Sequence, residues 1–150
     1  MKKEITKDYA EGAFQYYVGI GKPSYDSLKE RYIKNALEDY SYINKKVISI
    51  DDLGSDKKAM DYVDDKLKTK VGELEDILAI EKTLKLLNDT EKLVLEIVYF
   101  SSDNPIKKKA NMSKLVKKAC TITSLHEKTI HSYLRKVRVL FAYERGLRAY

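Results

Sequence analysis

The sequence predicts an all-α protein, and three of its features support that fold class. Apolar residues recur at steps of three and four along most of the chain, which is the spacing of one face of an α-helix. Only two prolines and six glycines interrupt the 150 residues. The composition, 43% hydrophobic and 35% charged, is typical of helices that bury one face and expose the other.

Two helices are expected at the N-terminus. The first covers residues 4–18, and its apolar positions are Ile5, Tyr9, Ala13 and Tyr16. Gly19 and Gly21 end this helix, and Ser24 can cap the second one. The apolar stripe of the second helix consists of Tyr25, Leu28, Tyr32, Ala36, Tyr40 and Ile43. An antiparallel helical hairpin that turns at GIGKP is the simplest arrangement.

Three more helices are expected in the middle of the chain. The stretch VISIDDLGSDKKA has the composition of a connection. A third helix follows over residues 57–70, with Met60, Val63 and Leu67 facing inward, and Gly72 breaks its pattern. The stretch ELEDILAIEKTLKLL predicts the fourth helix. EKLVLEIVYF is strongly apolar and should form the most buried helix.

The C-terminal third begins with SSDNPIKKKANM, a polar stretch that is expected to be an exposed loop. The next helix can be capped by Ser113. Its inward residues are then Leu115, Val116, Ala119 and Cys120. A short turn should follow near Thr123 to His126.

The start of the last helix has two competing caps. In one, Ser124 and Glu127 form a capping box, in which the serine accepts from a backbone amide and the glutamate reaches back. In the other, His126 occupies the cap position and Leu125 packs onto Ile130 across the first turn. The two alternatives place the start of the helix within two residues of each other.

The last helix, in LHEKTIHSYLRKVRVLF, has two chemically different faces. Its inward positions are Ile130, Leu134, Val137 and Phe141. Its outward positions are the cationic or polar residues Lys128, His131, Arg135 and Arg138. A small residue where two helices cross and a β-branched residue after the first turn are typical of a helix-turn-helix unit, whose second helix enters the major groove of DNA.

Charge is distributed unevenly along the chain. Residues 107–150 contain eight Lys and four Arg against two acidic residues, a net charge of +10. Since the whole chain carries +6, residues 1–106 carry −4. A basic segment on an acidic body indicates a polyanion as the partner, although a solvated charged face is the simpler alternative.

The stretch LNDTEKLVLEIVYF, followed by a helix-turn-helix that ends in TIHSYLRKVRVLFAYERGL, resembles region four of bacterial sigma factors. It is more similar to the sigma-like ArpU and RinA type regulators of late genes in phages. The resemblance covers residues 75–148, with Leu87 to Glu91 as the lead-in element and Thr129–Ile130 as the pair on the recognition helix. Ser124 stands near the place where the family usually has a glycine, and no promoter-melting region is recognisable.

This resemblance implies a sequence-specific transcriptional regulator, encoded by a phage or a mobile element. The expected division is a tyrosine-rich acidic region over residues 1–70, which packs or binds a partner, and a DNA-binding domain over residues 71–150. The partner is double-stranded DNA, with RNA polymerase and a second copy of the chain as further candidates. The expected DNA-binding residues are Lys117, Lys118, Lys128, His131, Ser132, Arg135, Lys136 and Arg138.

Two alternative functions remain open. The tyrosine-rich N-terminal part can be a protein-interaction module that holds RNA polymerase or a partner regulator. A small terminase-like subunit of phage DNA packaging also joins a helix-turn-helix to an oligomerising part. A monomer or dimer favours transcription, and a ring of eight or more copies favours packaging.

Catalysis is not expected, and neither is a cofactor or a metal. His126 and His131 are five residues apart, which is the wrong spacing for two ligands on one helical face. GIGKPS lacks the spacing and the preceding strand of a phosphate-binding loop. Cys120 is the only cysteine, so no internal disulfide can form. With no membrane-spanning run and no signal peptide expected, the cytoplasm is the expected compartment.

Overall fold

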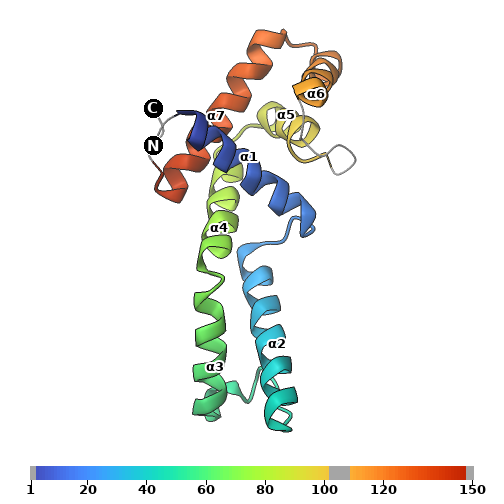
Figure 1. Cartoon of the computed structure of the whole chain (residues 1–150). Helices are drawn as coiled ribbons and strands as arrows, with labels where there is room; N and C mark the ends of the chain where they lie inside the picture. The colour runs from blue at the N-terminus through green and yellow to red at the C-terminus, as the bar shows by residue number, and fades with distance from the viewer. Residues whose placement is uncertain (1–2, 102–108, 148–150) are drawn as a thin grey trace. The chain divides into compact units, whose positions relative to one another are not determined.

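The structure is a computed structural model that describes residues 3–101 and 109–147. No β-strand occurs within these ranges, and the all-α prediction is confirmed for them. Figure 1 shows the helices in chain order. They are α1 (Lys3–Gly19), α2 (Tyr25–Asn44), the short 3-10 helix η1 (Leu53–Ser55), α3 (Lys57–Lys68), α4 (Val71–Lys85), α5 (Asp89–Val98), α6 (Lys109–Thr123) and α7 (Glu127–Arg145).

The chain divides into two compact units. The first, here called the basic unit, combines Met1–Lys22 with Asp76–Tyr150, and the second, the α2–α3 unit, is Pro23–Glu75. The basic unit carries 19 Lys and Arg against 11 Asp and Glu, a net +8. The α2–α3 unit carries 10 against 12, a net −2. The division differs from the expected one between residues 70 and 71, because α1 belongs with the C-terminal helices.

An aromatic cluster explains why α1 belongs to the basic unit. Phe14 is buried, and its ring centroid lies 5.3 Å from Phe141 of α7 and 5.2 Å from Tyr99. Phe100 adds a ring 6.0 Å from Phe14 and 5.1 Å from Tyr17. Since α1 is packed in this way, the expected hairpin of the first two helices is not confirmed, and α2 pairs with α3 instead.

The end of α1 follows the sequence signal. Gly21 has a φ of +89°, the left-handed conformation that glycine adopts without steric cost. The Lys22 N–H donates to the Tyr17 carbonyl and the Gly21 N–H donates to the Val18 carbonyl. This pair of bonds satisfies carbonyls that the end of the helix would leave without partners.

The α2–α3 unit has a small core of its own. Ala36, Leu37 and Val63 are buried in it, and Ile33, Ile48, Leu53 and Leu67 pack around them. The Ser24 cap is confirmed, since its hydroxyl accepts from the Ser27 N–H at 3.1 Å. Met60 was expected to face inward, but 39% of it is exposed. Ala59 occupies the buried position beside it, one residue earlier on the helix.

The lead-in to the C-terminal helices is a complete capping box. Asn88 accepts from the Glu91 N–H at 2.8 Å, and Glu91 accepts from the Asn88 N–H at 3.0 Å. The helix that follows, α5, is rich in buried residues, as its apolar sequence predicts.

The expected cap at Ser113 is wrong, because α6 already begins at Lys109. Lysine, alanine and methionine before Ser113 are good helix formers. Residues 102–108 of the predicted loop lie outside the described residues.

Replacing Phe14 with Ala should lower the free energy of unfolding by about 3–5 kcal/mol, since it removes the buried ring shared by α1, α5 and α7. Chemical denaturation followed by circular dichroism measures this loss. Tyr143→Ala is the matched control, because this aromatic side chain of α7 is 78% exposed. Its effect should stay within about 0.5 kcal/mol. If both substitutions lowered the free energy of unfolding equally, the conclusion that the core depends on Phe14 would be wrong.

Candidate nucleic-acid interface

A three-residue turn joins α6 to α7 (Figure 1). The Thr123 hydroxyl donates to the Ala119 carbonyl at 2.6 Å and accepts from the Leu125 N–H at 3.3 Å. Ser124 has a φ of +59°, a conformation for which glycine is the usual residue. The turn therefore keeps the backbone geometry of a glycine turn although it contains a serine.

Of the two competing caps, the structure has His126 at the cap position. Its backbone is extended, and its side chain makes no capping hydrogen bond. The alternative capping box of Ser124 with Glu127 is wrong, because Ser124 adopts the left-handed conformation and lies two residues before the cap. The first turn of α7 still contains the acidic Glu127, which is favourable next to the positive end of the helix dipole.

The inward face of α7 is as predicted. Ile130, Leu134, Val137 and Phe141 are all buried. On α6, Leu115, Val116 and Ala119 are buried, and Cys120 is partly buried. The helices α5, α6 and α7 each contact the other two, and α1 also contacts α7. The opposite face of α7 is consequently directed away from this core.

Seven of the eight predicted DNA-binding residues are exposed. Six of them are Lys117 and Lys118 on α6 and Lys128, His131, Ser132 and Arg135 on α7, and the seventh, Lys136, is half-exposed. Lys128, Ser132 and Arg135 follow each other at steps of four and three, which places them on one stripe of the helix. The stripe continues through Val139 and Tyr143, which are 45% and 78% exposed.

Lys136 is bound within the protein. Its Nζ lies 2.7 Å from Oε2 of Glu91, the same carboxylate that closes the capping box of α5. Burial alone raises the pKa of Glu91, but hydrogen bonds from Lys136 and the Asn88 amide, together with the lysine charge, lower it more. The net pKa is below the ordinary value, so this ion pair ties the start of α5 to the middle of α7.

Arg138 is also held within the protein. Its Nη1 donates to the Tyr99 hydroxyl at 2.8 Å, and Arg138 is only partly exposed. Burial raises the pKa of the Tyr99 phenol well above its ordinary value, so the hydroxyl stays protonated at neutral pH. The nearby carboxylate charge of Glu11 on α1 adds to this effect. Arg138 thus lies on the flank of α7 and is part of the link between α7, α5 and α1.

Sequence reasoning missed Lys114, which is exposed on α6. It lies three residues before Lys117 and four before Lys118, so the three side chains share one side of the helix. Their spacing could have identified it, but the expected helix start at Ser113 placed Lys114 in the first turn. The partners of Lys136 and Arg138 lie 45 and 39 residues away and leave no local signal.

Neither a metal site in the described residues nor a matching known protein points to a particular chemistry. No group of three His, Cys, Asp or Glu that could hold a metal ion occurs in the described residues. Among the helices that the structure describes, none is long and apolar enough to cross a bilayer. The chain matches no protein-family model, no curated protein and no solved structure.

Glu91→Gln should be less stable than the native chain at pH 7 by about 1 kcal/mol, because glutamine keeps the cap but loses the ion pair with the half-exposed Lys136. The pKa of Glu91 is below its ordinary value of 4.5 in the folded state. Its contribution is therefore present above that value and is lost as the pH falls through the folded pKa. The free energies of unfolding of the native chain and of the variant, measured by denaturation, should therefore converge as the pH falls from 7 to about 3. A difference in unfolding free energy that does not change with pH would contradict the ion pair.

Proposed function

We propose that this protein is a sequence-specific DNA-binding transcriptional regulator. The observation that carries the proposal is the exposed stripe of Lys128, Ser132 and Arg135 on a helix whose other face is buried. The helix follows a three-residue turn, as a recognition helix does in a helix-turn-helix unit. The net charge of +8 on the basic unit supports a polyanionic partner.

In this proposal α7 lies in the major groove and contacts base edges. Arg135 can donate two hydrogen bonds to guanine, and Ser132 can donate to or accept from several bases. Lys128 and His131 lie toward the start of the helix, the part that reaches deepest into the groove in related docking geometries. His131 Nε2 lies 3.8 Å from Glu127, so contact with a phosphate competes with this exposed carboxylate.

The exposed lysines of α6 contact phosphates. Lys117 and Lys118 were expected in this role, and Lys114 joins them on the same side of the helix. Phosphate contacts fix the register of a protein on DNA but carry no sequence information directly. Lys136 and Arg138, which have partners at 2.7 and 2.8 Å inside the unit, orient α7 rather than read bases.

A sigma-like role in phage or mobile-element transcription rests on the sequence resemblance of residues 75–148. Contact with RNA polymerase belongs to the same proposal.

A protein-interaction module is the second candidate, favoured by the exposed apolar side chains Tyr42, Ile43 and Val47 in the α2–α3 unit. A packaging role would require a ring of about eight or more copies, which native mass spectrometry distinguishes from a monomer or dimer.

Arg135→Ala should weaken binding to a duplex selected from a random-sequence pool by about tenfold or more, because it removes a base contact. Arg138→Ala should change stability as well as affinity, since Tyr99 then loses its partner. Fluorescence anisotropy measures affinity, and circular dichroism checks the fold. Lys82→Ala is the matched control, an exposed cation of the basic unit outside α6 and α7. Unchanged affinity of a folded Arg135→Ala variant would favour the interaction module.

Binding to DNA should weaken strongly with salt. If about five phosphates are neutralised, the slope of log affinity against log salt concentration should lie near −4 to −5. Replacing Lys117 with Ala should make the slope less negative by about one and weaken all sequences alike. Anisotropy titrations between roughly 50 and 200 mM salt provide the slope. A response independent of salt would exclude phosphate contacts as the source of affinity.

A further inference from the structure

Exposed apolar side chains gather at one end of the α2–α3 unit. Tyr42 and Ile43, in the last turn of α2, are 87% and 63% exposed. Val47 is 95% exposed and Ile50 is 37% exposed, in the segment between α2 and η1. Four large apolar residues within nine positions of the chain form a patch of the kind that marks an interaction site.

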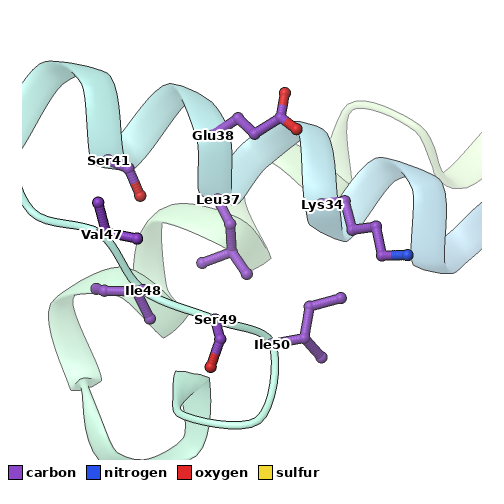
Figure 2. Close-up of a pocket in the computed structure, with 8 residues that line it drawn as sticks. All are labelled: Lys34, Leu37, Glu38, Ser41, Val47, Ile48, Ser49 and Ile50. Atoms are coloured by element: carbon purple, nitrogen blue, oxygen red, sulfur yellow. The ribbon is translucent and has the colours of Figure 1, made fainter.

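The same segment borders a groove of about 470 Å³. Figure 2 shows the residues that line it, with Leu37 projecting from α2 toward the segment that contains Val47 to Ile50. Leu37 is only 4% exposed and belongs to the core of the unit. An apolar floor and an exposed valine therefore lie on the same face of the unit.

The segment is anchored, so Val47 is held in place. Lys46 Nζ forms an ion pair with Asp56 at 2.9 Å. The Ser49 hydroxyl donates to Asp52 at 2.8 Å, and Ile48 packs against the core. Because the residues on both sides of Val47 have partners within the unit, little backbone conformational entropy remains to be lost when a partner buries the valine side chain.

The charges beside the groove are self-complementary. Lys34 and Glu38 both line the groove and are one helical turn apart on α2. Two copies of α2 that pack antiparallel about a two-fold axis between these residues bring each Lys34 against the other copy's Glu38. Within one chain Lys34 lies 3.2 Å from Glu30, but both side chains are about 60% exposed, so this pair is weak and exchangeable.

We propose that this face pairs two copies of the chain, with Val47 of each copy seated in the groove of the other. The partner is a second copy because one face carries a projecting apolar side chain, an apolar groove and charges of both signs. A net charge of −2 also leaves little repulsion between two α2–α3 units. The proposal goes beyond DNA binding and holds whether or not α7 contacts DNA.

Sedimentation velocity of the full chain without DNA, at roughly 1–100 μM, tests the pairing. The native chain should shift from monomer to dimer across this range. Val47→Glu should remain a monomer, because the carboxylate cannot be buried in an apolar groove. Leu86→Glu is the matched control, an apolar residue of the basic unit that is 54% exposed, and it should dimerise like the native chain. Circular dichroism verifies that each variant is folded.

A charge exchange tests the two-fold arrangement itself. Lys34→Glu and Glu38→Lys should each raise the dissociation constant about tenfold, since like charges then face each other. The double variant should recover affinity close to that of the native chain. A native chain that stays monomeric, or a dimer insensitive to Val47→Glu, overturns the proposal. A double variant no tighter than the single variants overturns the pairing of Lys34 with Glu38. Since DNA is absent, none of these results depends on the proposed function.

Discussion

The basic unit depends on the burial of Phe14 among Phe141, Tyr99 and Phe100. These rings come from three helical segments that are far apart in the sequence, and their burial closes the core beneath α7. Aromatic rings bury a large area each, so a few of them can fix the position of a helix. Because α1 supplies Phe14, the N-terminal residues help to position the helix that we propose reads DNA.

Polar contacts around this cluster limit how far α7 can move. Arg138 binds Tyr99, Lys136 binds Glu91, and Arg145 lies 2.7 Å from Asp76 of α4. Asp76 also accepts a hydrogen bond from Tyr9 of α1 at 2.8 Å. Three of the cations on α7 are thus used for internal contacts, and Lys128 and Arg135 remain exposed. A count of positive residues therefore overstates the charge that α7 can offer to DNA.

The sequence predicted the existence of the helices well, because apolar spacing and caps such as Ser24 and the Asn88–Glu91 box are local signals. It predicted their pairing poorly. The short GIGKP connection suggested a hairpin, but Phe14 packs with residues more than eighty positions away. The candidate interface shows the same limit. Helical spacing alone predicts the outward stripe of α7. The partners of Lys136 and Arg138, however, depend on tertiary contacts that no local pattern contains.

The difference in net charge between the two units, +8 against −2, suggests separate tasks. A surface that binds DNA needs cations that stay in water until phosphates replace the solvent, and α6 and α7 carry such side chains. A surface that binds another protein needs apolar groups that leave water, and the exposed residues between Tyr42 and Ile50 provide them. Placing both on one surface would bring repelling cations into a protein interface. Keeping them on separate units allows each to be optimised for its own partner. The tyrosine-rich N-terminal third then has two roles: α1 completes the basic unit, and α2 carries the surface that we propose pairs two copies of the chain.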